Sequence, residues 1–430
     1  GIIPRKHPVA YKKFRYEPPP YIKFTTPVLQ EALGTIVGSD MLVKETGHVA
    51  MPEAIEKLAI TIGTTTYKMG LGGIHSQESE VSLYSDDESY LRDIDVVSYY
   101  PNLMLNMGMY PDTMGPHFLH AYREILDERV SAKRSGDSVK AALLKITLNG
   151  TFGKTASKYS VLYNPKMMIA TTITGQLSVL MLIEAFEKRG VKVVSANTDG
   201  IVVHCRRDKE ALQRRIVKAW EQLTNLETEE TDYKSIHSRD VNSYIAVKTD
   251  GKIKTKGFFA KSGLAKSPQN DICTDAAVAY ITSGTRVEET IRQCADLTKF
   301  LTVRRVTGGA VKDGEPVGKT IRWYYSTKVV GPMHYLTSGN VVPRSVGARA
   351  ALNMPDQFPD DIDYDWYAAE ANERLMAIGV VPRVIYPKLP RRNTLLWKKL
   401  EGGGLVEVDD YGVPRWAVHL DDIPEEHRHL

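Results

Sequence analysis

Two aspartates lie in apolar runs where a carboxylate could do phosphate chemistry. Asp95 lies in LRDIDVVSYY, and Asp199 lies between the Val- and Ile-rich halves of VKVVSANTDGIVV. A carboxylate at a buried strand end is costly unless it is paired, hydrogen-bonded or bound to a metal. Two acids from separate strands of one sheet could bridge two Mg²⁺ ions, which serves phosphoryl transfer. The plainer alternatives are an exposed strand-end Asp95 and a structural Asp-Gly turn, in which Gly200 supplies the positive φ.

A polar and aromatic stripe follows in the segment KITLNGTFG. Lys145 and Asn149 are four residues apart and Phe152 lies three further on, so all three share one face of a helix. Such a face offers a cation for phosphate and a ring on which a base can stack. Arg129 and Lys133 have the same four-residue spacing on the preceding segment. A solvated helix face is the alternative for either pair.

Strands, hairpins and helices must bring these residues together. The Asp-Gly pairs at 199–200 and 250–251 predict two β-hairpins. The first 50 residues, rich in Pro and aromatics, predict an extended arm. Hydrophobic periodicity and turn residues predict a short amphipathic helix at 51–62 and an antiparallel helical hairpin formed by 116–134 and 139–152. They also predict an apolar helix at 171–189 and a charged helix at 208–223.

The composition describes an ordinary globular chain. Of the 430 residues, 42% are hydrophobic and 25% are charged, which leaves room for two or three domains. No apolar run approaches the roughly 18 residues of a membrane span, so we expect no membrane partner. Three cysteines without zinc-like spacing indicate a reducing, intracellular compartment. The net charge of +4 permits a polyanionic partner without requiring one.

Three segments, in order, resemble motifs A, B and C of family B DNA polymerases, whose usual forms are DxxSLYP, KxxxNSxYG and DTDS. They are Asp95 to Pro101 (DVVSYYP), Lys145 to Gly153 (KITLNGTFG) and Asn197 to Gly200 (NTDG). Two weaker matches agree in position. Tyr67 to Gly73 is similar to the YxGG template-binding turn, and Lys254 to Phe259 is similar to the KKxY DNA-binding motif. The resemblance spans roughly residues 67–259.

The resemblance implies a role for each matching residue. Asp95 and Asp199, with the backbone carbonyl of Val96, would bind two Mg²⁺ ions, with Mn²⁺ as an alternative ion. Tyr100 would be the steric gate that excludes a 2′-hydroxyl. The remaining nucleotide-binding residues would be Ser98, Tyr99, Arg129, Lys133, Lys145, Asn149 and Phe152, and the DNA-binding residues Tyr67, Gly72, Gly73, Lys254 and Lys256.

Departures from the family pattern fall in motifs A, B and C. Gly150 and Phe152 replace the usual Ser and Tyr, and Tyr99 replaces the usual hydrophobic residue before the gate. Asn197 replaces the first aspartate of motif C, and its amide brings no charge to a metal. Asn197, Thr198 and Lys140 therefore receive no assigned role.

The implied architecture is an α+β right hand with an antiparallel-sheet palm, short helical-hairpin fingers and a mixed thumb. An N-terminal arm (1–66) is expected to pack on the palm, which is formed by two segments (67–115 and 153–260). The fingers (116–152) lie between these two segments in the chain, and the thumb and C-terminal region follow (261–430). Fewer than 67 residues precede the YxGG-like turn, too few for the family's 3′–5′ exonuclease. We therefore expect a module without its own proofreading, whose nuclease was removed or is supplied by another polypeptide.

The implied function is template-directed addition of dNTPs to a primer 3′-hydroxyl. Primer–template DNA, dNTPs and replication factors are the expected partners. Fingers this short resemble phage, viral or plasmid members, so the cytoplasm of a bacterial host is the expected location for a phage-encoded protein. Two alternatives remain open: a catalytically silent, polymerase-like DNA-binding subunit, and a palm polymerase that copies RNA.

Overall fold

The computed structural model describes residues 12–263, 266–329, 331–355 and 357–385, together with the strand backbones 396–399 and 405–408. The chain divides into two compact units, Gly1–Phe258 and Phe259–Leu430. Helices and antiparallel strands occur in both units, so the expected α+β class is confirmed.

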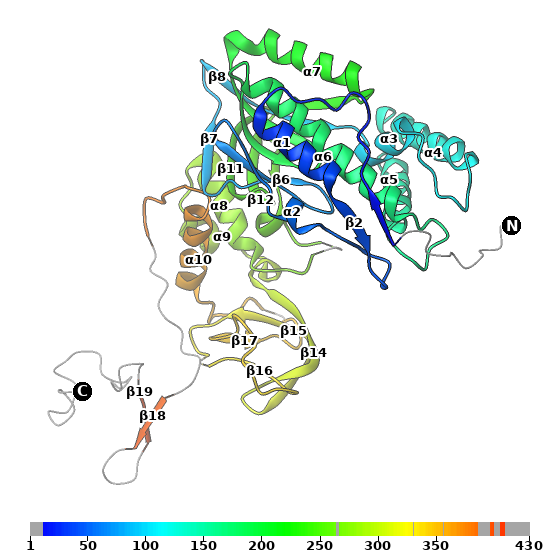
Figure 1. Cartoon of the computed structure of the whole chain (residues 1–430). Coiled ribbons are helices and arrows are strands. Elements are labelled where there is room, and N and C mark those ends of the chain that lie inside the picture. The colour runs from blue at the N-terminus through cyan, green and yellow to red at the C-terminus, as the bar shows by residue number, and fades with distance from the viewer. Residues whose placement is uncertain are drawn as a thin grey trace. The chain divides into compact units, whose positions relative to one another are not determined.

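A ten-stranded sheet forms the centre of the first unit (Figure 1). Its order is β13-β12-β11-β8-β10-β9-β6-β5-β4, with β7 also pairing with β11. Strand β8, which carries Asp95, therefore lies between β10 and β11. The strands are β4 Ala59–Ile62, β5 Thr65–Met69, β6 Ile74–Ser76, β7 Val81–Tyr84, β8 Ser89–Val96, β9 Lys192–Asn197, β10 Gly200–Arg206, β11 Thr228–Asp240, β12 Ser243–Lys248 and β13 Ile253–Thr255. The two predicted hairpins are β9–β10 and β12–β13.

Helix α6 (Pro165–Glu187) packs against this sheet and is covered by α1 (Pro27–Gly38) and α7 (Glu210–Thr224) (Figure 1). It begins earlier than predicted, because Asn164 caps it by accepting from Met167 N at 2.9 Å and Pro165 occupies its first turn. By length and composition α6 could cross a membrane, which revises the expectation about apolar runs. However, 83% of its apolar window is buried within the protein, as in the core helix of a globular domain.

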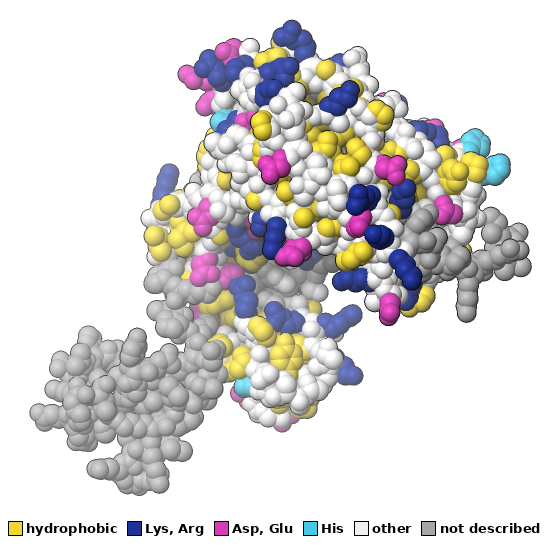
Figure 2. Space-filling model, in the orientation of Figure 1, with side chains coloured by type: hydrophobic (Ala, Val, Ile, Leu, Met, Phe, Trp, Pro, Cys, Tyr) yellow, Lys and Arg dark blue, Asp and Glu magenta, His cyan; other side chains and the backbone are white. Residues whose placement is uncertain are grey.

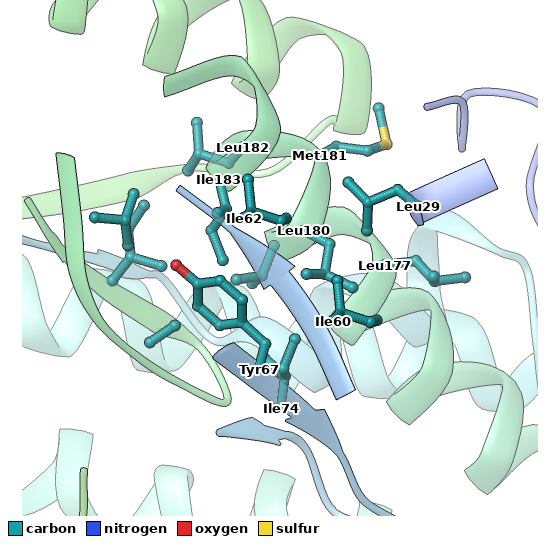
Figure 3. Close-up of a cluster of buried hydrophobic side chains, with 14 of the residues drawn as sticks. Leu29, Ile60, Ile62, Tyr67, Ile74, Leu177, Leu180, Met181, Leu182 and Ile183 are labelled. Atoms are coloured by element: carbon teal, nitrogen blue, oxygen red, sulfur yellow. The ribbon is translucent and has the colours of Figure 1, made fainter. Parts of the chain in front are cut away.

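The core beneath α6 joins helix and sheet side chains (Figure 3). Leu177, Leu180 and Ile183 of α6 are fully buried there, and Tyr67 and Ile74 from the sheet are fully buried with them. Each such side chain contributes about 1.5–3 kcal/mol of transfer free energy. The central part of the sheet, which contains the β9–β10 hairpin, is thereby fixed to α6.

Three helices come after the C-terminal end of β8 in the chain. They are α3 Tyr99–Asn106, α4 His117–Arg134 and α5 Ser138–Lys154. Asp137 caps α5 by accepting from Lys140 N at 3.0 Å, which confirms the predicted helical hairpin and its polar turn. Strand β8 ends at Val96 and α3 begins at Tyr99, so the tyrosines that follow Asp95 are helical. Pro101 is tolerated there because the first turn of a helix leaves its N–H groups unbonded.

The N-terminal segment is more structured than an extended arm. It forms α1 and a three-stranded sheet of β1 Lys13–Arg15, β2 Asp40–Val43 and β3 Val49–Ala50. The buried Glu184 of α6 accepts hydrogen bonds from Thr25 N, Thr26 N and Thr26 Oγ1 at 2.9, 2.6 and 2.8 Å. The amphipathic helix expected at 51–62 is wrong: only α2 (Glu53–Glu56) is helical, because the β-branched run at the end of the segment joins the sheet as β4.

The second unit contains helices and a four-stranded sheet of order β16-β14-β15-β17. Its helices are α8 Asp271–Ser283, α9 Val287–Gln293 and α10 Tyr364–Met376, and its strands are β14 Thr302–Lys312, β15 Glu315–Tyr325, β16 His334–Tyr335 and β17 Ala348–Ala350. Strands β18 Leu396–Lys399 and β19 Leu405–Val408 pair separately. On the face seen in Figure 2, basic and acidic side chains are interspersed, in keeping with the small net charge.

Candidate active site

The end of β8 and the tip of the β9–β10 hairpin bring the two predicted carboxylates to the same place. Gly200 is paired with Asp95 across β10 and β8. The amide N–H of Val96 donates to the carbonyl oxygen of Asp199 at 2.7 Å. Motifs that lie 100 residues apart in the chain therefore share one strand pair, as two metal-binding acids of one sheet require.

Gly200 supplies space and not the positive φ of the turn. The left-handed residue of the turn is Thr198, with φ of 53°. A Cβ atom built on Gly200 would lie 2.2 Å from Oδ1 of Asp95. The expectation that this glycine serves the turn conformation is therefore wrong: its missing side chain is the space that the Asp95 carboxylate occupies.

A third carboxylate, Asp93, lies beneath the pair. It is buried, it accepts from the Tyr233 hydroxyl, and its Oδ2 lies 2.9 Å from Nζ of Lys254. Nζ of Lys254 is also 4.0 Å from Asp95. Burial is the largest single effect and lowers the pKa of Lys254, but Asp93, Tyr244 and Tyr233 together raise that pKa overall. The Lys254 ammonium thus neutralises the acidic floor of the site, while its predicted contact with DNA stays a prediction.

Asp95 and Asp199 hold their protons more tightly than usual. Burial in the pocket and the neighbouring Asp93 charge raise the pKa of Asp95 to about 6. Burial also raises the pKa of Asp199, and the positive charge of Lys145 opposes that rise. Carboxylates placed this closely among acids are stabilised in their charged form by a bound cation.

A pocket of about 680 Å³ opens over these acids. All of the predicted metal and nucleotide residues line it, and Lys254 and Lys256 join them from the DNA-binding set. They are Asp95, Val96, Ser98, Tyr99, Tyr100, Arg129, Lys133, Lys145, Asn149, Phe152, Asn197, Thr198, Asp199, Lys254 and Lys256. The helical spacing of Lys145, Asn149 and Phe152 thus presents all three side chains to one cavity, as predicted.

The basic residues of α4 and α5 differ in how they are held. The Arg129 guanidinium donates to the hydroxyl of Ser98, and Lys133 pairs with both oxygens of Glu229 at 2.5 and 2.6 Å. Lys140 lies outside the pocket and pairs with Glu128 of α4 at 2.7 Å. Lys145 is exposed in the pocket, and the described residues provide it with no ion pair.

Two stacked tyrosines serve different purposes at the start of α3. The Tyr99 side chain is buried and donates to the carbonyl oxygen of Gly175 in α6 at 2.5 Å, so only its backbone faces the site. The Tyr100 ring lies 4.7 Å from the Phe152 ring, centroid to centroid, and its hydroxyl donates to the Gly72 carbonyl. Tyr100 and Phe152 therefore form one aromatic wall of the pocket.

The Gly-rich turn reaches the site through its backbone. Tyr67 is fully buried under α6, so the expectation that its side chain contacts DNA is wrong (Figure 3). The Thr198 amide donates to the Ile74 carbonyl oxygen at 2.9 Å, and a Cβ atom on Gly73 would lie 2.5 Å from Oγ1 of Thr198. Close approach to the hairpin tip explains the glycine at 73.

Several further pocket residues were not singled out from the sequence, among them Asp93, Glu229, Asn242 and Tyr244. Asp93 could have been found, because a residue two positions before Asp95 points to the same face of a strand. Glu229 is opposite Asp95 on β11. It belongs to a charged stretch of sequence, and only the strand pairing distinguishes it from its neighbours.

The donor set fits divalent magnesium. Asp95 and Asp199 supply carboxylate oxygens, and Val96 supplies a backbone carbonyl at the end of β8. Across the described part of the chain, no cluster of three or more His, Cys, Asp or Glu side chains has the arrangement of a complete metal cage. Mg²⁺ characteristically uses one or two carboxylates and completes its octahedron with water and substrate phosphates.

No known protein family's sequence profile matches this chain, and no curated protein does so either. Among solved structures, the chain is similar to the family B DNA polymerase from the hyperthermophilic archaeon Pyrobaculum calidifontis. The sequence identity is 16% and the TM-score 0.42, over 72% of this chain. The match spans 47% of the polymerase chain, about half its length.

Proposed function

We propose that the chain is a template-directed DNA polymerase that adds dNTPs to a primer 3′-hydroxyl. The observation that carries the proposal is the meeting of Asp95, Asp199 and Lys145 in one pocket, since these residues come from three motif-like segments far apart in the sequence. An acid pair, a cation and an aromatic wall are what nucleotidyl transfer needs: metal binding, phosphate neutralisation and base stacking.

In this proposal the first unit up to Phe258 forms the palm and fingers. The α4–α5 hairpin is the fingers and the ten-stranded sheet is the palm, while the second unit supplies the thumb. Two Mg²⁺ ions, when bound by Asp95 and Asp199, would activate the primer hydroxyl and stabilise the pyrophosphate leaving group.

The chain's own residues bind and orient the substrates. Lys145 is available to the triphosphate because it makes no ion pair among the described residues, and the amides at the start of α3 offer further donors to phosphate oxygens. Lys133 is held by Glu229 at 2.5 Å, so the incoming phosphates must exchange with that carboxylate. Tyr100 and Phe152 would pack against the sugar and the nascent base pair.

Extension of a labelled primer with Mg²⁺ and dNTPs tests the proposal. The full chain should extend a primer on a DNA template, and chelation of Mg²⁺ should stop it. D199A should abolish extension while salt-dependent binding of primer–template persists, because Lys and Arg contacts dominate that affinity. Extension on RNA templates alone would favour an RNA-copying enzyme. DNA binding without extension would favour a silent subunit.

A further inference from the structure

Asn197 uses its side-chain amide to hold a neighbouring loop. Its Nδ2 donates to the carbonyl oxygen of Val241 at 3.2 Å and to Oδ1 of Asn242 at 3.0 Å. Its Oδ1 accepts from the Thr198 hydroxyl at 3.2 Å. Both ends of the amide are therefore used, and an aspartate could not replace it because a carboxylate donates no hydrogen bond.

The loop that Asn197 holds also contacts the lysine-bearing segment after β12. A Cβ atom on Gly257 would lie 2.1 Å from the carbonyl oxygen of Asn242, so the two backbones are in close contact. The Phe258 amide donates to the Ser243 hydroxyl at 3.3 Å, and the Lys256 amide to the Tyr244 carbonyl at 3.0 Å. Loop 241–242 thus lies between the catalytic hairpin and the segment that carries Lys254 and Lys256.

We infer that Asn197 is a positioning residue that ties the Asp199 hairpin to the Lys254–Lys256 segment. The inference deepens the proposed polymerase function and rests on it for its catalytic consequence. It accounts for an amide where the family pattern has an acid: the site already contains Asp93, Asp95, Asp199 and Glu229, and the donor at 197 replaces a fifth negative charge. The Asn242 side chain could rotate to meet a carboxylate, whereas the Val241 carbonyl could not.

Two matched substitutions separate hydrogen bonding from charge. N197D removes the donors and adds a carboxylate. N242D adds the same charge within the same contact but leaves an acceptor for the Asn197 amide. Hydrogen–deuterium exchange of segment 241–258 measures whether the Asn197 hydrogen bonds hold this segment, and it does not depend on catalysis. Primer extension, its Mg²⁺ dependence and primer–template affinity measure the functional consequence.

We expect N197D to raise the exchange rate of segment 241–258 about tenfold and to lower kcat about tenfold. Each change corresponds to the net loss of one or two hydrogen bonds. N242D should change both several-fold less. N197A removes the donors without adding charge, so it should loosen the same segment even if N197D folds poorly.

Equal effects of N197D and N242D would overturn the inference in favour of a charge effect. An exchange rate of segment 241–258 in N197A equal to that of the wild type would also overturn it. Faster extension at lower Mg²⁺ by N197D would instead make Asn197 a weakened metal ligand. If the wild type does not extend primers, the proposed function fails, while the exchange comparison still decides whether the tie exists.

Discussion

Gly200 lies directly opposite Asp95 in the paired strands, and Oδ1 of Asp95 stands 2.2 Å from the place a Cβ atom on Gly200 would take. A glycine that looks like an ordinary turn residue therefore determines where the carboxylate of Asp95 can point. The position of the carboxylate depends on a side chain that is missing from its neighbour.

Gly200→Ala should displace the Asp95 carboxylate and lower the rate of primer extension on the order of 10²-fold, because small misplacements of reacting groups are this costly. Single-turnover extension measures the effect, with thermal unfolding as a check on folding. Gly34→Ala is the matched control, since its Cβ atom would meet nothing within 4 Å in α1. Comparable losses in both variants would contradict the spatial role of Gly200.

Tyr100→Val should weaken discrimination against ribonucleotides roughly tenfold or more, because it removes the ring that packs 4.7 Å from Phe152. The ratio of kcat/KM for dNTP and NTP measures it. Tyr100→Phe keeps the ring and loses only the hydroxyl bonded to Gly72. It should retain discrimination, and the gate role is refuted if the two variants behave alike.

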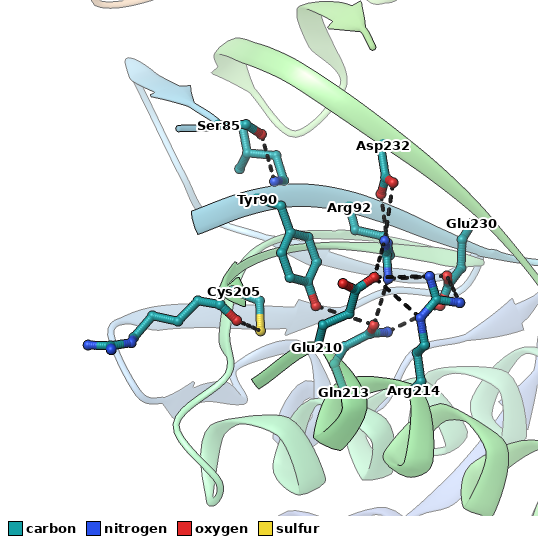
Figure 4. Close-up of polar contacts among 11 residues, drawn as sticks. Ser85, Tyr90, Arg92, Cys205, Glu210, Gln213, Arg214, Glu230 and Asp232 are labelled. Atoms are coloured by element: carbon teal, nitrogen blue, oxygen red, sulfur yellow. Dashed lines mark hydrogen bonds and ion pairs between the residues drawn. The ribbon is translucent and has the colours of Figure 1, made fainter. Parts of the chain in front are cut away.

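Arg92→Met should destabilise the first unit by about 1–3 kcal/mol, because three partly exposed acids lose the buried guanidinium that bonds them. Arg92 bonds Asp232, Glu210 and Gln213 at 2.6, 2.9 and 3.0 Å and joins β8 to β11 and α7 (Figure 4). Urea unfolding measures the change. Arg206→Met, which breaks an exposed pair with Asp208, should leave the urea midpoint nearly unchanged.

Stability should fall as the pH drops below about 6.5 because of His237. Burial lowers the pKa of this imidazole from 6.5 to about 4. Between those values the unfolded chain binds a proton that the folded chain does not, so stability is full above 6.5 and its loss is complete below 4, about 3 kcal/mol in all. His237→Gln should flatten this slope in urea titrations, whereas the exposed His120→Gln should leave it intact.

Residues whose positions follow from local periodicity were the ones the sequence could predict. Lys145, Asn149 and Phe152 reach one pocket because a helix brings their spacing to one face, and the β9–β10 hairpin follows from its β-branched runs. The burial of Tyr67 under α6 and the pairing of Lys254 with Asp93 could not be predicted, because both depend on packing between distant segments. The prediction of a helix at 51–62 was wrong because the end of this segment pairs with β5 as strand β4, and this pairing outweighed the helical pattern.

The three hydrogen bonds at Glu184 make the N-terminal segment an internal part of the first unit. They satisfy a carboxylate that is only 6% exposed, and they come from residues about 160 positions earlier in the chain. Any shortened version that begins after α1 would leave this charge buried without donors and would uncover the apolar side of α6. Because Tyr16, Ile22 and Phe24 are buried in the same core, proteolytic trimming that removes them or Thr25 and Thr26 should turn a folded polypeptide into an aggregating one.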